Sequence, residues 1–343
     1  MIVIAFKLKD LASQLGISPS TVSLALHNRP GISEATREKI FDALREQGLE
    51  ELIPAARPRL LKNIRLVLYK NGKDIITDTP FFLQLIEGID QQAKRSGINL
   101  MISYLTCGPS IKEQVEQLKE NDCEGIILLA TEMSAEQTAP FRSLGLPLVA
   151  LDGNFEEIGL DCVTISNAFS MKKAVEHLIK LGHKKIGYLK GSPPIKNFTE
   201  RFEGYCQALE EAGIPLPEDG IIKSAPTPEA AYETMKQRLL QRGVTCTAFV
   251  ADNDNILCGA MKAFREYNVA VPERVSVVGF DDLPLTELFD PPLTTIRVPK
   301  RQMGEISVSL MSSLLGDSFE TPVKISVATE LVLRKSTAPP AIL

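Results

Sequence analysis

Residues 8–28 read LKDLASQLGISPSTVSLALHN and carry apolar side chains at helical spacing on both sides of Gly16. Gly16 is a suitable end for the first helix. Ser18 is a favoured N-cap for the second helix, and Pro19 suits its first position, where a missing N–H leaves no helical bond unmade. Two helices joined only by Gly-Ile-Ser are typical of a helix-turn-helix. The two apolar stripes consist of Leu8, Leu11, Ala12 and Leu15, and of Val22, Ala25 and Leu26.

A third helix follows over EATREKIFDALREQG, residues 34–48, with Ser33 as its N-cap and Gly48 as its stop. Its Ile40, Ala43 and Leu44 fall on one face. Residues 1–48 are therefore predicted to form a three-helix domain. An ordinary three-helix bundle without a role in DNA binding remains the structural alternative.

The first residues of the second helix of a helix-turn-helix meet base edges in the major groove, and its free N–H groups suit phosphate oxygens. Here those residues are Pro19, Ser20, Thr21 and Leu24. Serine and threonine hydroxyls bond phosphates or bases, and leucine contacts a thymine methyl. Charge adds little, because residues 1–63 carry nine basic and seven acidic side chains.

From Asn63 onward, short apolar runs rich in β-branched residues alternate with helical patterns. Such alternation predicts parallel sheets covered by helices on both faces. Seven or more strands over the remaining length favour two doubly wound sheets over one, so the fold class is α/β. The predicted strands are 64–69, 98–105, 124–130, 146–152, 184–191, 246–253 and 275–282. The predicted helices are 81–97, 110–121, 168–182, 199–213 and 256–268.

Composition excludes several classes of protein. Hydrophobic residues make up 44% and charged residues 24% of the 343 residues, as in a soluble globular protein, and no apolar stretch is long enough to span a membrane. The first residues lack a basic region and a cleavage site, so we expect no signal peptide and a cytoplasmic protein. Six scattered cysteines without a CxxC pair predict free core thiols, and no metal site or cofactor is expected.

Catalytic motifs are also missing. The chain has no GxxxxGK[ST] loop, no GxGxxG after a strand and no GxSxG elbow. Asp281 and Asp282 are adjacent in sequence and are not the facing carboxylate pair that glycoside hydrolysis requires. We therefore predict that the protein is not an enzyme.

The segment LKDLASQLGISPSTVSLALHNRPGISEATREKIFDAL, residues 8–44, closely resembles the DNA-binding head of the lactose/galactose repressor family. The matching positions are Asp10, Ala12, Gly16, Ser18, Thr21, Val22, Ser23, Leu26, Asn28, Ser33, Thr36 and Arg37. Five later segments are similar to family segments in the same order, namely TPFFLQLIEGI (79–89), RFEGYCQAL (201–209), ADNDNILCGAMKAF (251–264), VPERVSVVGFDDLPL (271–285) and PPLTTIRVPKRQMG (291–304).

This resemblance implies an allosteric repressor with a helix-turn-helix head, a hinge and a body like the periplasmic sugar-binding proteins. The implied limits are 1–48 for the head, 49–63 for the hinge, 64–166 with 299–325 for the N-subdomain, and 167–298 with 326–338 for the C-subdomain. The implied DNA contacts are Ser18, Pro19, Ser20, Thr21, Ser23, Leu24, Asn28 and Arg29 in the head, and Arg57, Leu60 and Leu61 in the hinge.

Two positions depart from the family pattern. Leu24 stands where the family usually has arginine, so an apolar contact is expected there in place of a guanine contact. Pro58 stands where a short hinge helix would insert a leucine wedge into the minor groove, and proline disfavours that helix.

The resemblance also implies an effector pocket in the cleft between the subdomains. Its carboxylates, amides, arginine and aromatic rings suit a polyol, most simply a sugar or sugar derivative. Asp254 is equally suited to cap the helix after its strand, and one of the two phenylalanines is expected to pack in the core. The implied residues are Phe81, Phe82, Asp152, Asn197, Arg201, Asn253, Asp254 and Asp281.

The expected partners are a small-molecule effector, a second copy of the chain and a pseudo-palindromic DNA operator read by the two heads of the homodimer. No membrane partner is expected. Two alternatives stay open at this point. A solute-binding transport component has the same body but needs an export signal and has no use for residues 1–48. A regulator of the same architecture can instead be controlled by a protein corepressor.

Overall fold

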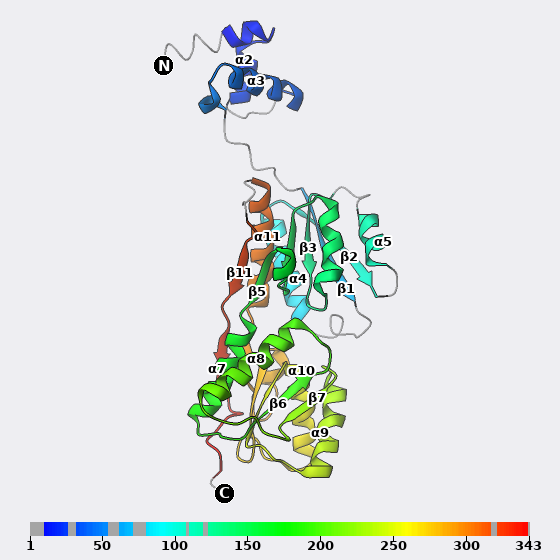
Figure 1. Ribbon diagram of the computed structural model, residues 1–343, viewed down its shortest axis with the longest axis vertical. Helices are drawn as coiled ribbons and strands as arrows, with labels where there is room; N and C mark the ends of the chain where they lie inside the picture. The colour runs from blue at the N-terminus through cyan, green and yellow to red at the C-terminus, as the bar shows by residue number, and fades with distance from the viewer. Residues whose placement is uncertain are drawn as a thin grey trace. The chain divides into compact units, whose positions relative to one another are not determined.

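The computed structural model describes residues 10–26, 32–53, 62–70, 80–107, 110–118, 123–316 and 321–341. The chain forms two compact units (Figure 1). One unit contains the N-terminal helices, and the other contains two β-sheets with their covering helices. None of the described helices is long and apolar enough to cross a membrane.

The N-terminal unit contains a short helix at residues 10–14, then α2 (Pro19–Leu26), α3 (Glu34–Glu46) and the 3₁₀ turn η1 (Glu50–Leu52). Gly16 has a φ of +64°, a conformation that glycine adopts without strain, and it follows the first helix as predicted. The predicted apolar stripes are confirmed where they are described. The core consists of Leu11, Ala12, Val22, Ala25, Ile40, Ala43 and Leu44.

α2 and α3 begin with the same arrangement of serine and threonine. The backbone N–H of Thr21 donates to Ser18 Oγ at 3.1 Å, and that of Thr36 donates to Ser33 Oγ at 3.2 Å. These bonds satisfy N–H groups that have no helical partner, so both predicted N-caps are confirmed. The buried Arg37 donates from Nη1 to the Ala25 carbonyl oxygen at 3.1 Å and so ties α3 to the C-terminal end of α2.

The larger unit contains two six-stranded sheets, with strand orders β11-β5-β4-β3-β1-β2 and β12-β10-β9-β8-β6-β7. All neighbouring strands are parallel except β10 and β12, which are antiparallel. The prediction of two doubly wound sheets is therefore confirmed. We call the part built on the first sheet the N-subdomain and the part built on the second sheet the C-subdomain.

The N-subdomain strands are β1 (Asn63–Lys70), β2 (Asn99–Thr106), β3 (Gly125–Leu129), β4 (Leu148–Leu151), β5 (Asp161–Ile165) and β11 (Lys324–Val327). The C-subdomain strands are β6 (Ile186–Gly191), β7 (Ile221–Ser224), β8 (Ala248–Ala251), β9 (Ser276–Asp281), β10 (Thr294–Arg297) and β12 (Glu330–Val332). The helices are α4 (Pro80–Arg95), α5 (Ile111–Gln117), α6 (Ala135–Thr138), α7 (Asn167–Lys180), α8 (Lys196–Glu211), α9 (Pro228–Arg242), α10 (Asp254–Glu266) and α11 (Lys300–Gly316). Shorter 3₁₀ turns are η3 (Ala139–Leu144), η4 (Glu156–Ile158) and η5 (Pro284–Glu287).

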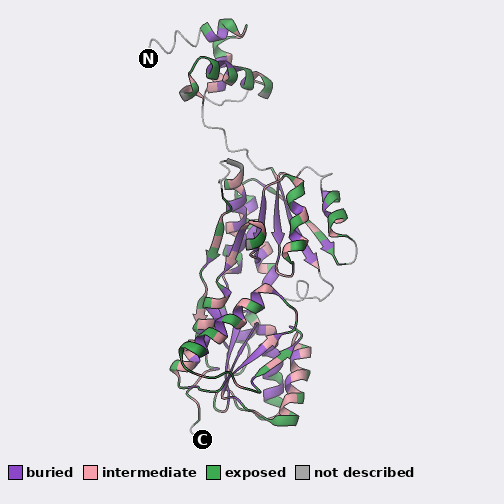
Figure 2. Cartoon of the chain, viewed as in Figure 1, coloured by how far each residue is buried: buried purple, intermediate pink, exposed green. Residues whose placement is uncertain are grey.

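The central strands of both sheets are buried, whereas the covering helices expose one face (Figure 2). The chain passes between the sheets three times: after β5, after β10 and between β11 and β12. β11 ends at Val327 and β12 begins at Glu330, so the last passage lies between these two residues.

Candidate DNA-contacting helix and effector cleft

The first turns of α2 present the side chains that the sequence assigns to DNA. Ser18, Pro19, Ser20 and Ser23 are exposed, whereas Thr21 and Leu24 are half-buried. Leu24 does not belong to the apolar cluster that forms the core of this unit. The remaining predicted DNA contacts, Asn28, Arg29, Arg57, Leu60 and Leu61, lie outside the described residues, as does Pro58.

A cavity of about 40 Å³ lies between the two sheets. Asp152 follows β4, Asn253 follows β8 and Asp281 ends β9, so the cavity occupies the carboxyl ends of parallel strands, where open α/β sheets bind ligands. The N-terminal turns of α4, α8 and α10 complete the walls. The lining residues are Phe81, Phe82, Thr131, Asp152, Ile195, Asn197, Phe198, Arg201, Asn253, Asn255 and Asp281.

Arg201, on α8, is the cationic centre of this cavity and is almost fully buried. Its Nε donates to Asn167 Oδ1 at 2.9 Å, and Nη1 donates to the backbone oxygen of Asp252. The guanidinium carbon lies 3.7 Å from the centroid of the Phe280 ring. Nη1 also forms an ion pair with Asp281 Oδ1 at 3.7 Å. These contacts fix the guanidinium plane before any ligand arrives.

Asp281 supplies a carboxylate oxygen that can accept a hydrogen bond from a ligand. Its Oδ1 is buried and accepts no hydrogen bond from any part of the chain that the structure describes. Burial raises the pKa of Asp281 to about 6, while the charges of Arg201 and Lys300 act to lower it. A buried polar atom without a hydrogen bond is unfavourable, so a ligand hydroxyl that donates to it would bind with a gain in free energy.

The backbone is strained at the same place. Asp152, Asp281 and Asp282 have φ angles of 58°, 113° and 54°, in a region that non-glycine residues rarely adopt. Strained backbone persists only where the surrounding structure fixes it, and it is typically found at functional sites. Asp282 points away from the cavity and forms ion pairs with Arg297 at 2.7 Å and with Arg334 at 2.6 Å.

Hydrogen bonds also join the two subdomains beside the cavity. Asn197 Nδ2, on α8 of the C-subdomain, donates to Asp152 Oδ1 of the N-subdomain at 3.1 Å. Within the N-subdomain, Thr131 Oγ1 donates to Asp152 Oδ2 at 2.6 Å. Burial raises the pKa of Asp152 to about 6, and these hydrogen bonds and the charge of Arg201 oppose that rise. Lys196 Nζ donates to the Asn154 backbone oxygen at 2.8 Å, and Lys300 Nζ donates to the Asp281 backbone oxygen.

The position of Asp254 requires a correction. Asp254 does not line the cavity and is completely buried. Its Oδ1 accepts from Thr295 Oγ1 at 2.8 Å, and its Oδ2 accepts from the Leu283 N–H at 2.8 Å. It is not the helix cap either, because α10 begins at Asp254 itself. The cap is Asn253, whose Oδ1 accepts from the Ile256 N–H at 3.0 Å while its side chain borders the cavity.

The two phenylalanines of α4, Phe81 and Phe82, are both buried and both line the cavity. Their rings meet edge to face, with centroids 5.1 Å apart. This T-shaped pair presents an apolar wall opposite the charged groups.

Sequence reasoning missed four residues that line the cavity: Thr131, Ile195, Phe198 and Asn255. Phe198 shares the inward face of α8 with Arg201 at a spacing of i, i+3, which is a signal that the sequence carried. Thr131 follows β3, the neighbour of β4, at the carboxyl edge that also carries Asp152. Ile195 and Asn255 had no comparable signal.

Comparison with known proteins agrees with this architecture. Residues 7–49 match the family described as bacterial regulatory proteins, lacI family, and residues 175–337 match a periplasmic binding protein-like domain. The HTH-type transcriptional regulator MalR of Streptomyces coelicolor is 30% identical over 346 residues, which cover 97% of this chain and 96% of that protein. The HTH-type transcriptional repressor PurR of Mannheimia succiniciproducens is 28% identical over 333 residues, 96% and 98% of the two chains.

Two solved structures extend the comparison. A complex of the transcriptional regulator CelR with cellobiose has a TM-score of 0.72 at 25% identity and covers 96% of this chain and 99% of that one. A lac repressor dimer bound to operator and the anti-inducer ONPF has a TM-score of 0.71 at 23% identity, with 96% and 98% covered. At 23% identity the similarity to the lac repressor indicates a shared fold and nothing further.

A helix-turn-helix head on a body of two sheets with a ligand cleft between them defines a class of effector-binding transcription regulators. The chain belongs to the lacI family of bacterial regulatory proteins. It is therefore a DNA-binding regulator and not an enzyme. The transport alternative gives no account of the match over residues 7–49.

Proposed function

We propose that this protein is a repressor that binds a pseudo-palindromic operator as a homodimer and responds to a sugar or sugar derivative bound around Arg201 and Asp281. The observation that carries the effector proposal is the buried Asp281 Oδ1, which lacks a hydrogen bond and lies beside a preorganised guanidinium. The domain limits proposed for this function are 1–48, 49–63, 64–166 with 299–325, and 167–298 with 326–338.

The cavity walls have the chemistry that a polyhydroxyl ligand requires. Asp281 and Asp152 accept from hydroxyls, and Asn197 and Arg201 donate to them. The edge-to-face pair of Phe81 and Phe82 would cover the apolar side of a ring. The complex of the related CelR with cellobiose is consistent with a carbohydrate effector.

In the described conformation the cavity is too small to contain such a ligand. Its cavity of about 40 Å³ is far smaller than the roughly 300–1,000 Å³ of typical ligand pockets. The bonds from Asn197 to Asp152 and from Lys196 to Asn154 must therefore break and form again when the effector enters. Because both subdomains contribute to the cavity, effector binding favours one arrangement of the subdomains over another. The same equilibrium couples the effector site to the heads, and the coupling is reciprocal.

In the head, α2 is the proposed recognition helix. Ser20 and Thr21 would contact phosphates or base edges, and Leu24 would contact a thymine methyl in the major groove. A single head makes few contacts, so two heads held by a dimer of bodies would supply the affinity. The solved lac repressor is a dimer on its operator, which is consistent with this arrangement.

The test combines a gel shift with a thermal-shift screen of the full-length protein. The DNA is the region upstream of the gene, and the screen contains sugars, glycosides and nucleobases. Asp281→Asn and Arg201→Lys should bind DNA as the wild type does but should lose the effector response. Glu203→Gln, on the exposed side of α8, is the matched control and should respond normally.

Two results would contradict the proposal. Failure of the wild-type protein to retard the DNA at low salt would exclude the repressor function. A normal effector response in both Asp281→Asn and Arg201→Lys would place the effector elsewhere in the protein.

A further inference from the structure

Arg65, on β1 of the N-subdomain, is a buried charge with few hydrogen-bond acceptors around it. The residue is only 6% exposed. Its Nη1 donates to Ser103 Oγ at 3.1 Å, and its Nη2 donates to Met101 Sδ at 3.9 Å. Nε is buried and makes no hydrogen bond, and no carboxylate pairs with Arg65 in the part of the chain that the structure describes. A buried guanidinium in this condition is unfavourable, so a stronger acceptor beside it would stabilise the fold.

The sulfur of Met101 is the weaker of the two acceptors, because a thioether accepts hydrogen bonds poorly. The parallel register of β1 and β2 places Met101 directly beside Arg65. On the other side of Arg65 the register places Ile126 of β3, which belongs to a buried apolar cluster. The guanidinium therefore has an apolar neighbour on one strand and a weak acceptor on the other.

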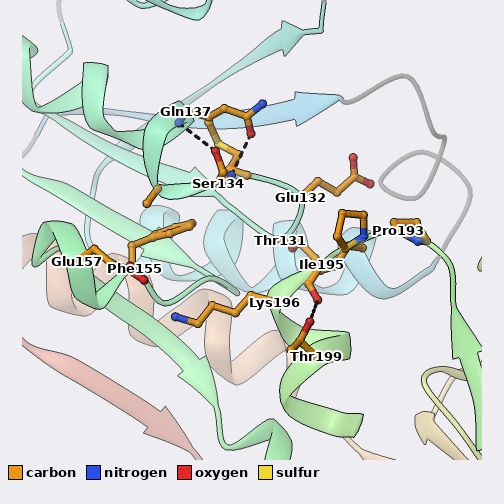
Figure 3. A pocket seen from close by; sticks show the side chains of 13 residues that line it. Thr131, Glu132, Ser134, Gln137, Phe155, Glu157, Pro193, Ile195, Lys196 and Thr199 are labelled. Atoms are coloured by element: carbon orange, nitrogen blue, oxygen red, sulfur yellow. Dashed lines mark hydrogen bonds between the residues drawn. The ribbon is translucent and has the colours of Figure 1, made fainter. Parts of the chain in front are cut away.

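Met101 is also the described methionine that solvent reaches most easily. It is half-buried and lies on β2, the outermost strand of its sheet. Met133 borders the pocket of about 500 Å³ shown in Figure 3, yet it remains only 6% exposed. Methionine oxidation follows exposure, so Met101 is the described methionine that a dissolved oxidant attacks first. The six buried methionines among the described residues are Met133, Met171, Met235, Met261, Met303 and Met311.

Oxidation would replace this weak acceptor by a strong one. Hydrogen peroxide transfers one oxygen atom to the thioether sulfur, so an S–O bond forms and the O–O bond of the peroxide breaks. The sulfur loses two electrons, and the peroxide is reduced to water. The new sulfoxide oxygen would lie next to a guanidinium that already contacts the sulfur. Hydrogen bonds from a charged donor are stronger than those between neutral groups.

We propose that Met101 is an oxidation site and that its sulfoxide oxygen accepts hydrogen bonds from the Arg65 guanidinium. The modification strengthens the link between β2 and β1, whereas a methionine sulfoxide without such a donor disturbs the packing around it. The proposed site lies apart from the effector cavity, whose lining contains neither residue.

The first measurement is the order of oxidation in the full-length protein. Limited hydrogen peroxide is added, and peptide mass spectrometry follows the oxygen gained at each methionine. Met101 should be oxidised at least about fivefold faster than each of the six buried methionines. In protein unfolded in urea these seven rates should become similar, which is the control for effects of local sequence.

The second measurement is hydrogen exchange of β2 in a partly oxidised sample. Peptides with and without the added oxygen at Met101 differ in mass, so both states are compared in the same sample. Oxidation should slow the exchange of the β2 amides about threefold or more, because the hydrogen bonds to Arg65 oppose local opening of the strand.

Variants at both positions test the role of the guanidinium. Arg65→Leu and Arg65→Ile remove the donor, and in both variants oxidation of Met101 should speed the exchange of β2. Arg142→Leu, at an exposed position of η3, is the matched control and should respond to oxidation as the wild type does. Met101→Gln brings an amide oxygen to the guanidinium, so without oxidant its β2 should exchange more slowly than that of Met101→Leu.

Three results would each overturn the proposal. Met101 could be oxidised no faster than the buried methionines. Oxidation could change the exchange of β2 equally in the wild type and in the two Arg65 variants. Met101→Gln and Met101→Leu could exchange at the same rate. If both Arg65 variants fail to fold, the comparison of Met101→Gln with Met101→Leu decides whether an oxygen at this position is held by Arg65.

Discussion

Leu24 is the residue of α2 at which this chain departs from the arginine usual in its family. It is half-buried and lies outside the core of the head, so its side chain is free to be changed without unpacking that core. We predict that Leu24→Arg shifts the preferred base towards guanine at one position of each half-site, because arginine forms two hydrogen bonds with guanine. Selection from a randomised operator library measures the shift. Leu24→Ala should weaken the preference for thymine without creating one for guanine, and an unchanged selected sequence in Leu24→Arg would show that residue 24 reads no base.

Four buried aspartates make the stability of the body depend on pH. Burial raises the pKa of Asp152 and Asp281 to about 6, that of Asp252 to about 7 and that of Asp254 to about 8, from a usual value of 3.8. Between pH 4 and pH 8 these four carboxyl groups therefore bind more protons in the folded state than in the unfolded state. Their contribution to the free energy of unfolding is fully present below this window and falls as the pH rises through it.

The upper end of this pH range is set by Asp254, because its pKa is raised to about 8. In Asp254→Asn the amide can still accept from the Leu283 N–H and donate to the Thr295 hydroxyl, while the buried charge is gone. We predict that this variant is more stable than the wild type at pH 8 and loses less stability between pH 6 and pH 8. Urea unfolding at four pH values measures both quantities, with Glu203→Gln as the exposed control. A pH profile identical to that of the wild type would mean that Asp254 is already ionised in the folded protein at pH 6.

At the scale of elements, paired helices approach closely at glycines. A Cβ on Gly204 of α8 would overlap the Ala168 carbonyl of α7, and one on Gly259 of α10 would overlap the Pro228 carbonyl of α9. Backbone atoms cannot move aside as a flexible side chain can, so the helices would have to separate. We predict that Gly204→Ala lowers the free energy of unfolding by about 1–3 kcal/mol, the usual range for overpacking. Chemical denaturation measures it, and Glu203→Ala, at the neighbouring exposed position, should change it little. Wild-type stability in Gly204→Ala would show that α7 and α8 can separate without loss.

At the scale of the whole molecule, the proposed homodimer predicts a strict operator geometry. Two heads that bind the same face of the duplex require a fixed distance between half-sites. Insertion of about five base pairs, half a helical turn, should rotate one half-site to the opposite face and reduce the affinity about a hundredfold. Insertion of a whole turn is the matched control and should restore part of the affinity. Gel-shift titrations measure all three operators, and equal affinity for a single half-site would contradict binding as a dimer.

The sequence by itself determined the features that depend on neighbours along the chain. Ser18, Pro19 and Gly16 set the limits of the first helices because capping and φ preferences are local. Apolar runs such as 124–130 indicated the central strands because such strands are buried on both faces. β5, β7, β10, β11 and β12 escaped prediction, because short strands with polar positions are stabilised mainly by the strands beside them.

Only the tertiary structure decided which members of each predicted site meet. Asn253 and Asp254 are adjacent, as are Asp281 and Asp282, yet one of each pair borders the cavity and the other is held by hydrogen bonds or ion pairs behind it. The residue at which α10 begins and the strained backbone at the end of β9 decide which member of each pair faces the cavity. Neither feature can be inferred from the residue types alone. The cavity likewise exists only because segments distant in sequence meet between the two sheets. Interactions between neighbours in the sequence determine where helices and strands form, whereas a cavity depends on contacts between residues far apart in the chain.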